Sequence, residues 1–523
     1  MGKYLNPGND GFRSIRKGEY IDKTGLIEYI NHTLGTKKKL TCVNRPRRFG
    51  KSFAAQMLSA YYDKSCDSEE LFHDMQIAGL PSYHTHLNKH NILYLDITWF
   101  ISTAGNIKDT VKNLQKSVIK ELKEIYPEYI DASEYSLPVA LADIAAESGS
   151  KMMIIIDEWD ALFREAKEDK LLQEEYVQLL RGLFRSSLTD KIVEAAYMTG
   201  ILPIKKYGNQ SALSDFYEFT MVDSAPIEEY VGFTEEEVRR LCEQSDLDFQ
   251  EMRHWYDGYI LGGHLHVYSP KSVLDAISRK RFGSYWTQTE TYESLKTYIT
   301  MNFDGLKNAI LSMLGGMKCK VDTNTFQNDM TTFRSKDDVL TLLVHLGYLA
   351  YDVSSECVFI PNQEVKEEFL RTIKNTDSPE LIQMIRQSER LLEATLQMDE
   401  EAVAGLLDKI HNEYSSPLFY NNEQSLRSVI QLAYISRVKD YLEFQELPGG
   451  KGYADIVFLP KRGSDKPLLI VELKWNKSAA GAIEQIKSKQ YMQVVEDFGS
   501  EILLVGINYD EKSKKHFCRI ERL

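Results

Sequence analysis

With 523 residues, of which 43% are hydrophobic and 27% charged, the chain is too long for a single hydrophobic core and has the composition of an ordinary globular protein with about three domains. Its net charge of −14 at pH 7 argues against a general nucleic-acid coat protein. Because no apolar run approaches the length of a membrane span, the N-terminus has no apolar signal core, and the six scattered cysteines form neither a metal-type nor a disulfide pattern, we expect a cytoplasmic protein without a membrane partner.

The first motif in the chain is a phosphate-binding loop. Its last three residues, Gly-Lys-Ser, match the Walker A motif, in which backbone amides curl around the phosphates, the lysine reaches the β and γ oxygens and the hydroxyl binds Mg²⁺. A β-type run over residues 40–43 enters the loop and a helical pattern leaves it from Phe53, so a helix N-terminus would face the phosphates. Arg45 replaces the motif's first glycine, so the loop predicts nucleotide binding and leaves hydrolysis open. The residues expected to bind ATP here are Arg45, Pro46, Arg47, Arg48, Phe49, Gly50, Lys51 and Ser52.

The second motif is an apolar strand that ends in acidic residues. Residues 152–156 form the continuous apolar run typical of a buried parallel strand, whose carboxyl end is where an open α/β sheet presents its ligands. With a P-loop upstream, this pattern indicates a Walker B motif, in which Asp157 would bind Mg²⁺ and Glu158 would polarise the attacking water. The plainer interpretation is a core strand followed by an acidic helix cap.

Two more strand-like runs indicate the type of nucleotide-binding sheet. Residues 92–97 lie between the P-loop and Asp157, so the two motif strands are not consecutive in the chain. Together with Glu158 beside Asp157, this order favours the additional-strand ATPases over the kinase or GTPase branch. Residues 193–200 form the next strand, and Thr199 near its end is a candidate sensor of the γ-phosphate, or else a cap for the following segment.

Arginines near these strands have two interpretations. Arg47 and Arg48 in the loop could pair with phosphate oxygens through their guanidinium groups. Arg181 and Arg185 stand four residues apart in a helical segment and could supply a finger-type charge, although a solvated helix face explains the same spacing.

The middle of the chain predicts a helical lid and a winged-helix-like region. Thr234 is placed as the N-cap of a lid helix, with Glu237 in the capping-box position. The amphipathic helix expected over residues 337–349 precedes a hairpin, as in a winged helix, but its acidic start and lack of arginines weaken a DNA-reading role. The aromatic segment 255–259 could contact the nucleotide base or a partner, but core packing is the more common fate of such residues.

Two strand-like runs near the C-terminus carry charges on otherwise apolar segments. Charges inside strands are costly unless they are paired or bind metal, so Asp455, Glu472 and Lys474 need an explanation. Glu472 and Lys474 are two residues apart and therefore share one face of their strand. Two carboxylates and a main-chain carbonyl could hold Mg²⁺, while the lysine orients the attacking water or helps to deprotonate it. Solvated charges on an edge strand are the alternative.

This Asp…Glu-x-Lys triplet resembles the signature of the PD-(D/E)XK nucleases, with Ala454 where those enzymes have proline. The predicted order of a helix over 423–439, three strands, a helix over 479–495 and a strand over 501–507 is similar to the αβββαβ core of that superfamily. The resemblance implies accessory roles for three further residues, Glu423, Gln485 and Tyr491.

The motifs as a set resemble the AAA-ATPase-like family of bacterial proteins, whose members typically carry a PD-(D/E)XK nuclease-like domain at the C-terminus. The resemblance covers essentially the whole chain. It rests on residues 12–16, 20–24, 45–52, 157–160 and 255–259. The arginine in place of the loop's first glycine is similar to the family's own loop.

The expected fold class is α/β: a P-loop additional-strand ATPase with a helical lid and a winged-helix-like region, followed by a smaller αβββαβ restriction-endonuclease-like domain. The expected boundaries are 1–225 for the ATPase core, 226–380 for the lid and winged-helix-like region, 381–415 for a helical connector and 416–523 for the nuclease-like domain.

The leading functional hypothesis is an ATPase, with ATP and Mg²⁺ as cofactors, that controls an attached Mg²⁺-dependent nuclease acting on nucleic acid, with DNA favoured over RNA. The catalytic residues would be Glu158, Asp455, Glu472 and Lys474, and the metal ligands would be Ser52, Asp157, Asp455 and Glu472. The alternative is a nucleotide-dependent switch or signalling ATPase whose nuclease-like domain only binds nucleic acid or partners. A homo-oligomer is compatible with either hypothesis.

Overall fold

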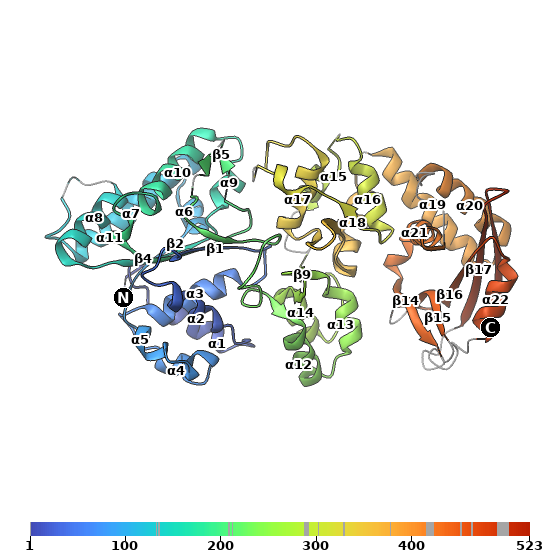
Figure 1. Ribbon diagram of the computed structural model, residues 1–523, viewed down its shortest axis with the longest axis horizontal. Coiled ribbons are helices and arrows are strands. Elements are labelled where there is room, and N and C mark those ends of the chain that lie inside the picture. Colours follow the sequence, from blue (N-terminus) through green and yellow to red (C-terminus); the bar gives the residue numbers. More distant parts are fainter. Residues whose placement is uncertain are drawn as a thin grey trace. The chain divides into compact units, whose positions relative to one another are not determined.

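The chain forms two compact units in the computed structural model (Figure 1). Unit 1 contains Met1–Phe249, Gly258–Lys280 and Val321–Glu356, and unit 2 contains Gln250–Asp257, Arg281–Lys320 and Cys357–Leu523. The structure describes residues 2–131, 133, 136–204, 206–207, 210–211, 213–286, 292–301, 303–327, 330–376, 378–414, 423–449, 452–461, 464–488 and 501–523. The four-part division expected from the sequence stays a prediction beside these two units.

The centre of unit 1 is a five-stranded parallel sheet in the order β2-β3-β4-β1-β7 (Figure 1). Its strands are β1 (Leu40–Asn44), β2 (Asn91–Asp96), β3 (Met152–Asp157), β4 (Val193–Gly200) and β7 (Tyr217–Phe219). Strand β4 lies between β1, which leads into the P-loop, and β3, which ends at Asp157. The predicted additional-strand arrangement is therefore confirmed.

Helices cover both faces of this sheet, which explains why β1 and β3 are buried along their whole length (Figure 1). One face carries α1 (Asp10–Arg16), α2 (Gly25–Thr33), α3 (Lys51–Tyr62), α4 (Glu69–Phe72) and α5 (Tyr83–His86). The other carries α6 (Ile97–Thr103), α7 (Thr110–Ile125), α8 (Leu137–Ser148), α9 (Ala161–Glu165), α10 (Lys170–Phe184) and α11 (Thr189–Ile192). Short 3-10 helices cover Gln76–Gly79 and Ile107–Asp109, and a small ribbon pairs β5 (Lys206–Tyr207) with β6 (Gln210–Ser211).

The rest of unit 1 contains the predicted lid helix and a small antiparallel sheet. The elements are β8 (Phe233–Thr234), α12 (Glu235–Ser245), β9 (Tyr259–Leu261), β10 (Leu265–Tyr268), α14 (Pro270–Arg279), a 3-10 helix over Thr323–Thr325, α17 (Lys336–Leu346) and β12 (Ala350–Asp352). The sheet order is β8-β10-β9. Thr234 and Glu237 form the predicted capping box at the start of α12. Helix α17 is followed in the chain by two short strands, β12 and β13 (Cys357–Phe359), the order predicted for this segment.

Unit 2 begins with helices and ends in the second sheet. The helices are α13 (Phe249–Tyr256), α15 (Tyr292–Ile299), α16 (Leu306–Leu314), α18 (Gln363–Lys374), α19 (Pro379–Leu396) and α20 (Glu400–Tyr414), and β11 (Cys319–Lys320) pairs with β13. The C-terminal part contains α21 (Glu423–Ala433), a 3-10 helix over Ile435–Lys439, β14 (Tyr441–Gly449), β15 (Gly452–Pro460), β16 (Leu468–Trp475), α22 (Ala479–Ser488), β17 (Ile502–Asp510) and β18 (Lys515–Arg522).

The second sheet has the order β14-β15-β16-β17-β18, with β16 and β17 parallel and the other neighbours antiparallel. Helix, three strands, helix and strand follow one another as predicted, and β18 adds an edge strand that the prediction lacked. Apolar side chains of α22 pack on one face of this sheet against Val457, Leu468, Ile470 and Leu504. Among the residues that the structure describes, no helix has the length and apolar character needed to span a membrane.

Candidate functional site

The P-loop turns the chain from the carboxyl end of β1 into the first turn of α3. Arg48 (φ 67°) and Gly50 (φ 91°) both adopt left-handed backbone conformations, and glycine takes this conformation without the cost that a side chain brings. Lys51 is the first residue of α3, only 4% exposed, and its Nζ donates to the Pro46 carbonyl at 3.1 Å. The loop therefore has a helix N-terminus and a buried lysine aimed into the same turn, the arrangement that phosphate binding needs.

Arg45 has a different position from the one that the motif predicted. Its guanidinium is fully buried, and one nitrogen, Nη1, donates to the carbonyls of Phe219 at 3.2 Å and Thr220 at 3.0 Å. Burial lowers the pKa of this guanidinium to about 10. The side chain thus holds the end of β7 to the loop through Nη1, while its Nε and Nη2 are buried without a hydrogen-bond partner among the described residues. Through Nη1, Arg45 therefore supports the loop, and a direct contact of its side chain with ATP stays a prediction.

The carboxyl end of β3 brings three of the predicted residues together: Asp157, Thr199 and Ser52. Thr199 on the neighbouring strand β4 donates a hydrogen bond to Asp157, and Ser52 on α3 donates a second. Tyr94 on β2 lies 3.4 Å from the other Asp157 oxygen. Burial raises the pKa of Asp157, and the hydrogen bonds from Thr199 and Ser52 oppose that rise. A hydroxyl and a carboxylate in contact are hard oxygen ligands, so Ser52 and Asp157 fit a divalent cation of the Mg²⁺ type.

Glu158 follows with a left-handed backbone (φ 53°), stabilised by a hydrogen bond of 3.2 Å from its amide to Thr199 Oγ1. Its Oε1 lies 3.4 Å from Lys51 Nζ, and its Oε2 accepts from Arg164 on α9. Burial alone would raise the pKa of Glu158, but the positive charges of Lys51 and Arg164 outweigh burial and hold this pKa below its usual value. Glu158 is therefore a charged carboxylate next to the P-loop lysine.

Arg164 is the functional candidate that sequence reasoning missed. It stands four residues after Asp160, and its Nε donates to Asp160 at 3.1 Å. The i,i+4 spacing of an acid and an arginine directly after the Walker B strand was the available signal, since such pairs meet on a helix face.

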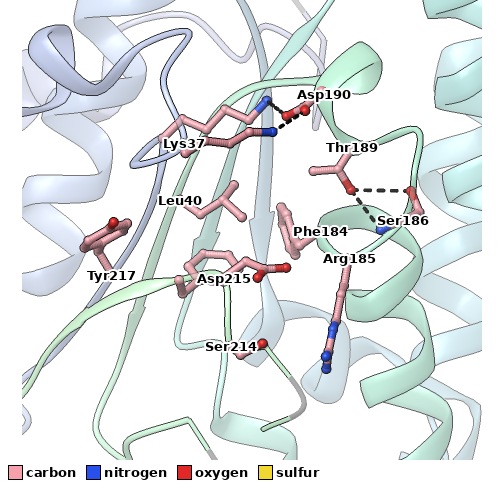
Figure 2. Close-up of a pocket in the computed structure, with 12 residues that line it drawn as sticks. Lys37, Leu40, Phe184, Arg185, Ser186, Thr189, Asp190, Ser214, Asp215 and Tyr217 are labelled. Carbon is pink, nitrogen blue, oxygen red and sulfur yellow. Dashed lines mark hydrogen bonds and ion pairs between the residues drawn. The ribbon is translucent and has the colours of Figure 1, made fainter. Parts of the chain in front are cut away.

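Of the two arginines proposed from sequence as finger-type charges, Arg185 lies away from this site in its own chain. Arg185 lines a cavity of about 550 Å³ together with Leu40 and Tyr217, the first residues of β1 and β7 (Figure 2). The P-loop follows the last residue of β1. The cavity therefore lies at the opposite end of the parallel strands, where β1 and β7 begin. Arg181 is exposed on α10. The position of Arg185 argues against a role in hydrolysis within its own chain, and a finger-type role for Arg181 stays a prediction.

The C-terminal triplet forms a second cluster on β15 and β16. Asp455 accepts from the Leu473 amide at 2.8 Å, and Leu473 lies between Glu472 and Lys474 in the chain. Lys474 Nζ donates to Glu472 at 3.0 Å and to the Leu473 carbonyl at 3.1 Å. Glu472 and Lys474 are 1% and 7% exposed, so the alternative of solvated edge-strand charges is excluded for this pair. Two carboxylates beside a main-chain carbonyl are a donor set that fits a divalent cation.

Accessory residues surround this cluster. Gln485 on α22 donates to Glu472, so the structure brings it to the triplet, and Arg427 on α21, which the sequence did not single out, donates to Asp455 at 2.9 Å. Glu423 is the first residue of α21, but its side chain lies outside the part of the chain that the structure describes. Tyr491 also lies outside the described residues.

Comparison with protein families identifies both parts of the chain. Residues 7–208 match the AAA-ATPase-like family, described as a predicted AAA-ATPase, and residues 421–517 match the PD-(D/E)XK nuclease superfamily. These domains imply the use of a nucleotide and of a divalent metal, and the second suggests nucleic acid as a partner. No curated protein matches the sequence.

Solved structures similar to the chain include three from archaea. A Walker-type ATPase of Pyrococcus abyssi is 14% identical, with 66% of this chain and 94% of that chain covered and a TM-score of 0.33. A signal transduction ATPase of the STAND type with a tetratricopeptide repeat sensor, from Pyrococcus horikoshii, is 14% identical, with 80% and 54% covered and a TM-score of 0.27. The Aeropyrum pernix ORC2 protein is 12% identical, with 67% and 93% covered and a TM-score of 0.25.

The position of Arg45 leads to a prediction about stability. Replacing Arg45 by alanine leaves carbonyls of the β7 end without their donor, so we expect the free energy of unfolding to fall by about 2–4 kcal/mol. Thermal unfolding followed by circular dichroism measures this change. Arg48→Ala, which removes an exposed arginine of the same loop, is the matched control and should leave the melting temperature almost unchanged. An Arg45→Ala protein that melts like the wild type but no longer binds ATP would contradict the structural role and favour a direct contact of Arg45 with ATP.

Proposed function

We propose that this chain, which joins an AAA-ATPase-like domain to a PD-(D/E)XK nuclease superfamily domain, hydrolyses ATP and uses its nucleotide state to control Mg²⁺-dependent cleavage of nucleic acid. The observation that carries the proposal is that two complete sets of charged side chains occur in one chain, one at the end of β3 and one on the neighbouring strands β15 and β16. One contains Lys51, Asp157 and Glu158, and the other contains Asp455, Glu472 and Lys474.

In the first set, the α3 N-terminus and Lys51 would bind the phosphates, and Ser52 and Asp157 would hold Mg²⁺, which neutralises phosphate charge when bound. Thr199 donates to Asp157 and accepts from the Glu158 amide, so it is placed to report on both residues. Glu158 is the carboxylate available to orient a water molecule and accept its proton.

In the second set, Asp455, Glu472 and the Leu473 carbonyl would hold a divalent metal, and Lys474 would orient the attacking water. The Lys474 ammonium already contacts both Glu472 and the Leu473 carbonyl, so it lies next to these oxygen ligands. DNA is the substrate that we propose to test first.

We propose that segment 255–259 couples the set of charged side chains at the P-loop to the set on β15 and β16. Tyr259 in unit 1 packs edge-on against Phe49 of the P-loop, with ring centroids 5.4 Å apart, and its hydroxyl donates to the Gly347 carbonyl at 2.5 Å. Four residues earlier, Trp255 in unit 2 lies under Lys461, with Nζ 4.8 Å from the ring centroid. Lys461 directly follows β15, the strand of Asp455. One short segment thus contacts the P-loop at one end and the end of the nuclease strand at the other.

A second candidate function is a nucleotide-dependent switch that binds ATP without hydrolysing it. It is favoured by two observations: arginine replaces the first loop glycine, and Lys51 is paired to Glu158. In this case the nuclease-like domain would only bind nucleic acid or partners.

ATP turnover distinguishes the two candidates. Lys51→Ala should weaken ATP binding and abolish turnover, because the lysine contacts the phosphates. Glu158→Gln should retain binding but lower kcat by about 100-fold or more, because the amide cannot accept the proton of the attacking water. Phosphate release and equilibrium binding of a fluorescent ATP analogue measure the two quantities. Stoichiometric binding without turnover in the wild type would favour the switch.

Cleavage of plasmid DNA tests the nuclease half. With Mg²⁺, the wild type should nick or linearise the plasmid at a rate that changes when ATP is added, and Asp455→Ala should lower that rate by about 100-fold or more because a metal-binding carboxylate is lost. The same assay with RNA and single-stranded DNA identifies the substrate. Equal cleavage by wild type and Asp455→Ala, or none on any substrate, contradicts the nuclease claim.

Tyr259→Phe tests the communication. The variant keeps the ring against Phe49 but loses the hydrogen bond to the Gly347 carbonyl, so we expect the ratio of cleavage rates with and without ATP to fall by about half or more, as a bond of about 1 kcal/mol is removed. ATP turnover and cleavage without ATP should change less than the ratio. Tyr126→Phe, which removes the hydroxyl of the residue directly after α7, is the matched control. An unaltered ratio in Tyr259→Phe removes this segment from the proposal.

A further inference from the structure

Arg164 occupies a defined position between two acidic side chains. Its side chain is 8% exposed, its Nη2 donates to Glu158 Oε2, and its Nε donates to Asp160 Oδ2 at 3.1 Å. One guanidinium therefore bridges the candidate catalytic carboxylate and a second carboxylate two residues later. A lysine could not reproduce both contacts in one plane, because an ammonium is a point charge without the fixed fork of a guanidinium.

Asp160 fixes the other side of this bridge. Its side chain is fully buried, and Oδ2 also accepts from the amides of Ile201 at 3.2 Å and Leu202 at 2.9 Å, directly after β4. The carboxylate is thus held by backbone that continues from the strand of Thr199. Because Asp160 cannot move without breaking these bonds, Arg164 is held in place as well.

The two oxygens of Glu158 consequently have different surroundings. Oε2 is bound by the fixed guanidinium, whereas Oε1 faces Lys51 Nζ at 3.4 Å. Lys51 also donates to the Pro46 carbonyl, and both contacts are ones that a phosphate oxygen with its negative charge would replace. After that replacement, Oε1 would be the oxygen of Glu158 left facing the phosphates.

We propose that Arg164 is a positioning residue for ATP hydrolysis, which holds Glu158 through Oε2 so that Oε1 is presented to the attacking water. The inference rests on the proposed ATPase function and assigns a role to a residue that the family comparison does not name. In the reaction, the water oxygen bonds to the γ-phosphorus while the bond from that phosphorus to the bridging β–γ oxygen breaks, Glu158 accepts one water proton, and ADP and inorganic phosphate are released. Arg164 touches none of the reacting atoms and acts only through Glu158.

Loss of Arg164 is expected to lower the rate of ATP hydrolysis and to leave the affinity for ATP almost unchanged. Misplacing a catalytic group by about 1 Å can cost about 100-fold in rate. We therefore expect Arg164→Ala to lower kcat for ATP about 10- to 100-fold, with the KM and the equilibrium affinity for ATP within about threefold of the wild type. Arg164→Lys, which keeps the charge but only one of the two contacts, should recover part of the loss.

A double variant separates this role from a purely structural one. If Arg164 acts through Glu158, the Glu158→Gln/Arg164→Ala protein should hydrolyse ATP at the rate of Glu158→Gln alone, since the group being positioned is already disabled. A structural role would instead lower the rate by the same factor in both backgrounds. Arg279→Ala, which removes an exposed arginine 3.7 Å from Asp275, is the control for loss of an ion-paired arginine.

The measurements are steady-state phosphate release, equilibrium binding of ATP and thermal unfolding of the full chain. Arg164→Ala and Arg164→Lys proteins with the wild-type kcat, or a double variant in which the two losses multiply, overturn the inference alone. A wild-type chain that binds ATP but never turns over overturns the proposed hydrolysis and this inference with it. If Arg164→Ala melts far below the wild type, Arg164→Lys tests the inference instead. Its kcat and its affinity for ATP are then compared with those of the wild type.

Discussion

Both candidate sites depend on one constraint: a buried charge must have a partner, because an isolated buried charge is too costly to keep. In unit 1 the partners form a row of alternating sign, from Lys51 through Glu158 and Arg164 to Asp160. In unit 2, Arg427 pairs with Asp455 and Lys474 with Glu472. The same contacts that make burial tolerable also orient each reactive group.

The unusual P-loop follows from the same constraint. The chain tolerates arginine in place of the first glycine because this residue continues the strand, its amide donating to the Gly200 carbonyl at 3.0 Å. The left-handed turns that favour glycine fall later, at Arg48 and Gly50. The buried guanidinium of Arg45 then finds backbone carbonyls at the end of β7, so the substitution ties the loop to a neighbouring strand.

The segment 255–259 gives the two domains a short covalent connection with both ends packed. Tyr259 meets the P-loop through Phe49, and Trp255 meets Lys461 at the end of β15. The nearly complete burial of Trp255 and Tyr259 agrees with the sequence expectation that these aromatics would pack in the core.

Local patterns in the chain were enough to predict both domains, the additional-strand order of the sheet, the capping box of α12 and the clustering of Asp455, Glu472 and Lys474. These predictions depend on strand periodicity and on short spacings, which act within a few residues. Tertiary structure decided four further features. They are the burial of Arg45, the bridge made by Arg164, the contact of Arg427 with Asp455, and the position of Arg185 near the amino ends of the strands. Each feature depends on the order of neighbouring strands in the sheet. That order is set by packing between residues tens to hundreds of positions apart, so it cannot be predicted from a local pattern.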